Sequence, residues 1–168
     1  MPILEDEKKR KEIIEQLTVA YWMEIETVMN YISSSVNLDG VRAEEIKKSL
    51  AADVTAEIGH AQQFARRIKN LSGITPGSFD FKPSQASLQP PAATTDVVSV
   101  IKGVIDAERG AIDHYTKLIK AVEVVDYVTQ DMAIGILADE QDHLREFEGF
   151  LKEYEPTAQK TTQKAGAA

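Results

Sequence analysis

Glu57-Ile58-Gly59-His60 and Glu140-Gln141-Asp142-His143 repeat one four-residue pattern, Glu-x-x-His, in a chain that contains three histidines. A helix places residues three apart on one face, so each copy can direct a carboxylate and an imidazole at one point. Another glutamate in a helical pattern precedes each copy, Glu24 by 33 residues and Glu108 by 32. Four glutamates and two histidines are the ligand set with which a four-helix bundle holds two metal ions in its core.

Four segments carry apolar side chains at intervals of three and four residues, which is the periodicity of amphipathic helices. They run over about residues 5–36, 41–71 and 95–122, and from a short break at 123–126 to about 154. Asp39 is a candidate N-cap for the second segment. The glutamates and histidines of the two patterns lie on the apolar stripes. We therefore predict an all-α fold, an antiparallel four-helix bundle.

Residues 72–95 contain four prolines and no helical period. A connection of this length is too long for a simple hairpin, and it suits a crossover between opposite ends of a bundle. We expect Phe79, Phe81 and Leu88 to attach it to the bundle surface. Residues 157–168 are small and polar, so we predict one domain over residues 1–156 followed by a disordered tail.

Composition excludes several classes of protein. The net charge of −8 argues against general nucleic-acid binding, which needs a basic surface, and it favours cations near the protein. Cysteine is absent, which excludes disulfides, thiolate zinc sites and iron–sulfur clusters. No apolar stretch reaches the length of a membrane span, and no signal peptide is evident. We expect a cytoplasmic protein without a membrane partner.

The charge of the predicted core favours metal. Four ionised glutamates in a bundle core would be very costly unless they were paired, and two divalent cations cancel their charge. Ligands rich in oxygen with two imidazoles suit Fe or Mn better than soft metals. Tyr31 and Tyr115 follow Glu24 and Glu108 by seven residues, so each shares its glutamate's face. They are candidate catalytic residues, as hydrogen-bond donors or electron donors, with plain core aromatics as the alternative.

Other residues have two readings. Asp53 and Asp139 are candidate partners for the second ring nitrogens of the histidine ligands, or simply members of a solvated helix face. His114 lies off the inward stripe, and we expect it at the surface. Trp22 is two residues from Glu24 and should point away from the core, which indicates a subunit interface.

The stretch from Asp126 to His143 resembles the fourth-helix motif of bacterioferritins, members of the ferritin-like di-iron carboxylate superfamily. The resemblance implies a ferritin-like bundle with a long crossover between its second and third helices. It implies a ferroxidase centre with two Fe ions per subunit, Mn or Zn being alternative occupants of the isolated protein. The implied metal ligands are Glu24, Glu57, His60, Glu108, Glu140 and His143, with Glu57 and Glu140 bridging and Tyr31 beside the site.

The chain also departs from bacterioferritins. Ile58 stands where that family has the Met that binds haem, so we expect no haem. Ala56 and Ala52 replace the acid and the His of the family's inner-surface iron relay. Only a small polar segment follows the fourth helical segment, so we expect no fifth helix there. A homo-oligomer of at least two subunits is expected, and a dodecamer, a smaller oligomer and a 24-subunit cage all stay open.

Three functions remain open from the sequence. The first is iron storage or detoxification, with oxidation of Fe(II) by O2 or H2O2. The second is a rubrerythrin-like reductase of peroxide or oxygen that stores no mineral. The third is a non-enzymatic bundle tied by its metals, or a DNA-protecting particle, which the acidic charge opposes. We predict the first.

Overall fold

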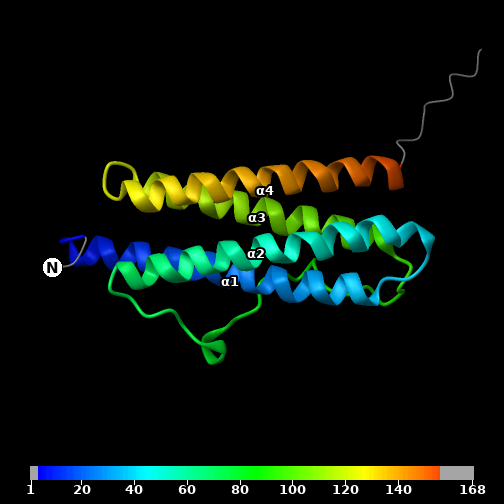
Figure 1. Ribbon diagram of the computed structural model, residues 1–168, viewed down its shortest axis with the longest axis horizontal. Helices are drawn as coiled ribbons and strands as arrows, with labels where there is room; N and C mark the ends of the chain where they lie inside the picture. The colour runs from blue at the N-terminus through cyan, green and yellow to red at the C-terminus, as the bar shows by residue number, and fades with distance from the viewer. Residues whose placement is uncertain (1–3, 156–168) are drawn as a thin grey trace, which may run out of the picture.

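The computed structural model describes residues 4–155, which form four long helices in one bundle (Figure 1). The helices are α1 (Glu7–Asn37), α2 (Glu44–Asn70), α3 (Val97–Val122) and α4 (Tyr127–Tyr154), with short 3₁₀ turns η1 (Val41–Ala43) and η2 (Ser78–Asp80). No strand occurs between residues 4 and 155. The prediction of an all-α, antiparallel four-helix bundle is confirmed. The predicted tail, 157–168, lies outside the described residues.

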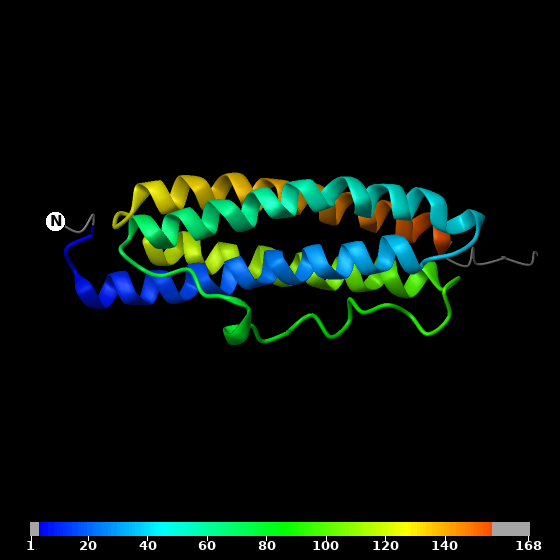
Figure 2. The same cartoon turned by 60° about the horizontal axis from the view of Figure 1, so that its bottom comes forward.

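The bundle consists of two helical hairpins, α1 with α2 and α3 with α4 (Figures 1 and 2). The connection between them starts at one end of the bundle and runs beside α1 to the other end, where α3 begins (Figure 2). This is the crossover that the length of the proline-rich segment predicts. None of the helices in the described part of the chain has the length and apolar character needed to cross a membrane.

Aspartate side chains cap three of the four long helices. Each accepts a hydrogen bond from a backbone N–H in the first turn, as an N-cap residue does. These caps are Asp6, Asp96 and Asp126. The predicted cap at Asp39 is wrong, because η1 precedes α2 and begins after Gly40, which makes no side-chain cap. Gly40 has a φ of 91°, a conformation that favours glycine.

The crossover is attached to α1 mainly through a buried carboxylate. Glu26 is 3% exposed and accepts hydrogen bonds from the backbone N–H groups of Ser84 and Gln85 at 2.9 Å and from the Ser84 hydroxyl at 3.0 Å. The Gln85 amide in turn donates to the Thr27 hydroxyl at 2.6 Å. The crossover also passes so close to α3 that a Cβ at Gly103 would lie 2.5 Å from the Ser87 carbonyl oxygen.

Two of the three predicted apolar anchors of the crossover hold it to the bundle. Leu88 is fully buried, and Phe81 lies against Trp22 with the ring centroids 5.1 Å apart. Trp22 therefore faces away from the core, as predicted, and the crossover covers part of it. The prediction for Phe79 is wrong, because its side chain is fully exposed at the tip formed by η2.

The apolar core is divided into two clusters along the bundle. One contains Leu50, Val104 and Phe147, and the other contains Leu17, Phe64 and Ile136. On each helix, the members of one cluster lie before the predicted metal ligands in the sequence, and the members of the other cluster lie after them. The predicted ligands therefore occupy a polar layer between two apolar regions.

Candidate metal centre

Six side chains from four helices converge in this polar layer. They are the six predicted ligands: Glu24 on α1, Glu57 and His60 on α2, Glu108 on α3, and Glu140 and His143 on α4. The four glutamates are 1–2% exposed, and His60 is 4% exposed. The bundle thus brings together all six residues that were predicted as ligands from the two Glu-x-x-His patterns and the two preceding glutamates.

The six side chains form two overlapping groups that could each hold a metal ion. Within each group the potential ligand atoms lie within 4.8 Å of one another. Glu24 and His60 belong to one group only, Glu108 and His143 to the other, and Glu57 and Glu140 to both. Shared carboxylates between two ligand groups are the arrangement required for carboxylates that bridge two ions.

The oxygen atoms of the shared glutamates point in different directions. Glu57 places Oε2 3.7 Å from Nδ1 of His60 and Oε1 3.2 Å from Nδ1 of His143. Glu140 places Oε1 3.1 Å from Nδ1 of His60 and Oε2 3.4 Å from Nδ1 of His143. Each carboxylate therefore offers one oxygen to each half of the layer, as a bridging ligand must.

Several of these atoms lack the hydrogen bonds that buried polar atoms normally make. Glu57 Oε1, Glu140 Oε1 and the Nδ1 atoms of both histidines are buried and have no hydrogen-bond partner within residues 4–155. Such atoms are rare in folded proteins, because each one costs free energy. Here they face one another at ligand distances, so cations placed between them would satisfy all of them at once. The donor set therefore fits a metal centre.

The protonation of the metal-free cluster is far from that of the free side chains. Burial raises the pKa of both Glu24 and Glu108 well above the ordinary 4.5. Burial alone would lower the pKa of His143, but the surrounding carboxylates, first Glu140 and then Glu57, raise it to about 11. The pKa of His60 is raised further for the same reason. Burial opposes ionisation of Glu57 too, yet its neighbours Glu24, His143 and His60 hold its pKa well below 4.5.

The two buried tyrosines contact the glutamates that are not shared, and they do so across the bundle. Tyr31 on α1 donates a hydrogen bond to Oε1 of Glu108 on α3, at 2.5 Å. Tyr115 on α3 donates to Oε1 of Glu24 on α1. Both tyrosines are fully buried, and burial raises the pKa of each hydroxyl. Each hydroxyl thus fixes one oxygen of a carboxylate whose other oxygen is free to face a metal.

The outward ring nitrogens of the two histidines face aspartates. Nε2 of His60 lies 3.1 Å from Oδ2 of Asp139, within hydrogen-bond distance, and Nε2 of His143 lies 4.0 Å from Oδ1 of Asp53. Burial raises the pKa of Asp53 to about 6. His114 belongs to a different part of the bundle, where it is half-buried and its Nε2 lies 2.9 Å from the carbonyl oxygen of Gln16.

Comparison with known proteins agrees with this geometry. The family model described as a ferritin-like domain matches residues 14–156. The chain belongs to the ferritin-like family. A bacterioferritin from Desulfovibrio desulfuricans is 28% identical over 144 residues, which cover 84% of this chain and 75% of the relative.

Two solved structures extend this likeness to the fold. A dodecameric thioferritin, the bacterioferritin-related protein of Bacteroides fragilis, has a TM-score of 0.75 and 26% identity, over 86% of this chain and 87% of its own. The diiron bacterioferritin of Desulfovibrio desulfuricans has a TM-score of 0.74 and 25% identity, over 87% and 81%. The predicted family is therefore confirmed. The roles of individual residues as ligands remain predictions.

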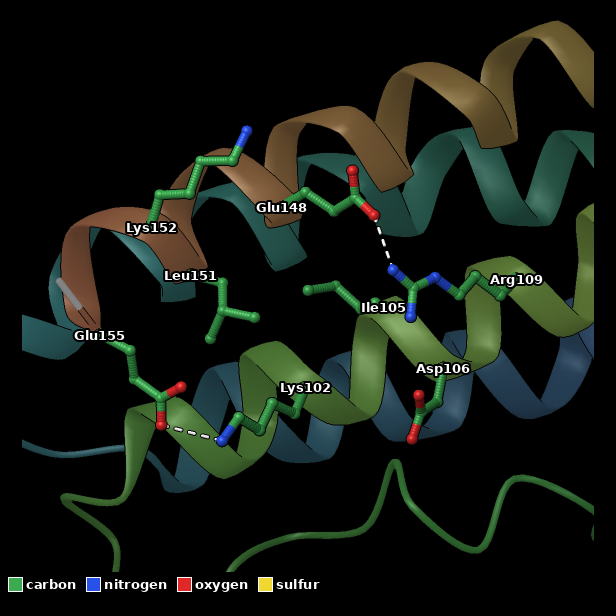
Figure 3. A pocket seen from close by; sticks show the side chains of 8 residues that line it. All are labelled: Lys102, Ile105, Asp106, Arg109, Glu148, Leu151, Lys152 and Glu155. Carbon is green, nitrogen blue, oxygen red and sulfur yellow. Dashed lines mark hydrogen bonds and ion pairs between the residues drawn. The ribbon is translucent and has the colours of Figure 1, made fainter. Parts of the chain in front are cut away.

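A surface hollow of about 560 Å³ lies between α3 and α4 (Figure 3). Two ion pairs of 2.8 Å cross it, Lys102 to Glu155 and Arg109 to Glu148, with Ile105 and Leu151 between them (Figure 3). None of the six predicted ligands lines it.

Proposed function

We propose that this ferritin-like protein is a di-iron ferroxidase, which oxidises Fe(II) with O2 or H2O2 for iron storage or detoxification. The observation that carries the proposal is the pair of overlapping ligand groups that share Glu57 and Glu140. Glu24 and His60 would complete one iron position, and Glu108 and His143 the other. Isolated protein could carry Mn or Zn in the same positions, since these ions accept the same donor atoms.

The oxidation balances as a two-electron reaction. Two Fe(II) ions bound as substrate give up one electron each, and the pair of electrons reduces one H2O2, with two protons, to two waters. With O2 as oxidant the same two electrons and two protons yield H2O2. Iron held in pairs therefore supplies in one place both electrons that the oxidant takes, and no one-electron oxygen product needs to be released.

The residues of the chain supply binding, orientation and exclusion of water. Glu57 and Glu140 hold the two positions together, and the histidines supply neutral nitrogen ligands once their Nδ1 protons have left. Tyr31 and Tyr115 hold the outer carboxylates of Glu108 and Glu24 in place through their hydroxyls. The apolar clusters on either side of the layer keep bulk water from both ends.

We include assembly in the proposal. The relative from Bacteroides fragilis is dodecameric by name, and the outward face of α1 in this chain carries exposed apolar side chains, among them Val19, Met29 and Ile32. A homo-oligomer would cover such side chains. A closed cage would also provide the space in which oxidised iron is stored.

An anaerobic Fe(II) titration followed by exposure to O2 tests the function. The wild-type protein should bind two Fe(II) per subunit and oxidise both far faster than buffer does. The variant with His60→Ala and His143→Ala should lose both properties, whereas His114→Ala, which removes the third histidine outside the cluster, should keep them. Equal oxidation rates in the double variant and the wild type would refute the proposal.

A rubrerythrin-like reductase is the second candidate. Ala52 and Ala56 favour it, because these two positions of α2 carry no polar side chain that could pass iron from the centre to a mineral. Sustained peroxide turnover with an external reductant, without accumulation of iron beyond two ions per subunit, would select this function. Growth of a mineral core during repeated additions of Fe(II) would select storage.

A further inference from the structure

Asp53 on α2 is a half-buried carboxylate next to the candidate metal centre. Its side chain is 16% exposed, its Oδ2 atom is fully buried, and that oxygen has no hydrogen-bond partner within residues 4–155. Aspartate is also a poor residue for the interior of a helix. The nearby carboxylates of Glu146, Glu57 and Glu140 oppose its negative charge further. Because the Asp53 carboxylate costs free energy in the folded protein, we look for a functional reason for its position.

In the described part of the chain, the imidazole of His143 is the one basic group within 4.0 Å of the Asp53 carboxylate. The two face each other because Nδ1 of the ring lies between Glu57 and Glu140, at 3.2 and 3.4 Å, which leaves Nε2 pointing outward. Oδ1 of Asp53 is 4.0 Å from Nε2. A histidine that gives Nδ1 to a metal keeps its proton on Nε2 and donates it to an outer acceptor.

The other half of the centre shows what such an acceptor does. Nε2 of His60 lies 3.1 Å from Asp139, the residue directly before Glu140. The matching residue before Glu57 is Ala56, which cannot accept a hydrogen bond from a ring. Asp53 lies three residues before Ala56, one helical turn along the same face of α2. Asp53 therefore supplies an acid one helical turn away from the position at which α2 has Ala56 and α4 has Asp139.

We propose that Asp53 is the positioning residue for His143, doing for the second iron position what Asp139 does for the first. This inference rests on the proposed function, because it concerns a histidine as a metal ligand. When His143 takes a metal at Nδ1, its Nε2–H donates to Oδ1 of Asp53, and the 4.0 Å gap closes to a hydrogen bond of about 2.9 Å. The bond fixes the tautomer and the plane of the ring.

The two positioning acids differ in their surroundings, which separates their effects. The side chain of Asp139 is 61% exposed, whereas that of Asp53 is 16% exposed. Water competes less for the less exposed carboxylate of Asp53, so its hydrogen bond to a charged or polarised ring should be stronger. Loss of Asp53 should therefore weaken the metal position beside His143 and leave the position beside His60 nearly unchanged.

Anaerobic Co(II) titration, followed by visible absorption and by ¹H NMR of the loaded protein, tests the proposal. Asp53→Asn should lower the affinity for one of the two Co(II) ions by about 10- to 100-fold, the usual effect of losing an outer partner of a metal ligand. It should also shift one of the two paramagnetically displaced imidazole N–H resonances, while Asp139→Asn shifts the other. A merely structural role of Asp53 would not move a single N–H resonance.

Two further variants make the test decisive. Asp142→Asn removes the same charge from a side chain that is 81% exposed, beside His143 but paired with Arg145, and it should change neither affinity nor resonance. In a His143→Ala background, Asp53→Asn should have no further effect. The proposal is overturned if Asp53→Asn behaves like Asp142→Asn, or if its effect persists in that background. Wild-type protein that binds fewer than two Co(II) ions contradicts the proposed function itself.

Discussion

Metal binding to the proposed centre would have to displace protons from its buried side chains. Burial raises the pKa of both Glu24 and Glu108 well above the ordinary 4.5, which favours their protonated forms when no cation is present. His60 and His143 are protonated at neutral pH, since their carboxylate neighbours raise both pKa values, that of His143 to about 11. All four groups must be deprotonated to act as ligands.

Anaerobic loading of two divalent ions at pH 7 should therefore release about two protons per subunit from the histidines, and more to the extent that Glu24 and Glu108 are protonated. Each proton released makes the overall binding constant for both ions tenfold weaker when the pH falls by one unit, so two protons weaken it by about 100-fold. The protons belong to the cluster as a whole, because the four groups titrate together. Ordinary surface carboxylates and histidines would release fewer than one proton on average.

Calorimetry of Co(II) binding in buffers with different ionisation enthalpies counts these protons. The wild-type value should be at least about two. The Glu24→Gln variant, which lacks one of the carboxyl groups with a raised pKa, should release fewer protons than the wild type. The matched exposed variant Glu12→Gln should release as many as the wild type. A wild-type value of one or less would show that the buried cluster does not hold the protons that the geometry assigns to it.

The stability of the metal-free protein should change with pH in the opposite direction. His143 has a folded pKa of about 11 against an ordinary 6.5, so its stabilising contribution is complete below pH 6.5 and is lost as the pH rises towards 11. Glu24 and Glu108 act in the same sense above pH 4.5, because the unfolded chain gives up their protons first. Urea denaturation should therefore show that the metal-free protein loses stability as the pH rises. The additional stability that bound metal gives should increase over the same pH range.

Three substitutions away from the metal ligands test how the bundle positions the centre. Val124→Gly should stabilise the protein by about 1 kcal/mol in urea denaturation, because Val124 has a φ of 54° and is 75% exposed; a loss of stability would contradict this. Asp126→Ala should cost about 3–5 kcal/mol, since it leaves buried Arg67 without its 2.6 Å partner, and a cost under 1 kcal/mol would refute the buried pair. Glu26→Ala should speed amide hydrogen exchange at Ser84, because the Glu26 carboxylate accepts a hydrogen bond from the Ser84 N–H. Unchanged exchange would show that other contacts hold the crossover.

Helix periodicity and ligand spacing predicted most of the fold and the membership of the candidate centre. The periodicity sets which face of each helix is buried, so Glu24 and Glu57 could be assigned to the core from the sequence alone. The spacing within Glu-x-x-His depends on a single helix and needs no tertiary information. The predicted ends of the helices fall within a few residues of the observed ones, since Asp6, Asp96 and Asp126 cap where the apolar pattern begins.

Features that depend on how the helices are aligned could not be predicted. The crossed hydrogen bonds of Tyr31 and Tyr115 require the relative height of α1 and α3, which no local pattern encodes. Glu26 is two residues from Glu24, on the side of α1 that a sequence pattern assigns to solvent, and the crossover happens to cover it. Phe79 was expected to be covered because it is apolar, yet η2 turns it outward.

The central claim is that six buried side chains hold two metal ions that share two carboxylates. Anomalous X-ray diffraction from crystals of the metal-loaded protein tests it most directly. Two peaks should appear in the polar layer, one beside Glu24 and His60 and one beside Glu108 and His143, with Glu57 and Glu140 contacting both. A single peak, or peaks confined to acidic groups on the surface, would contradict the account.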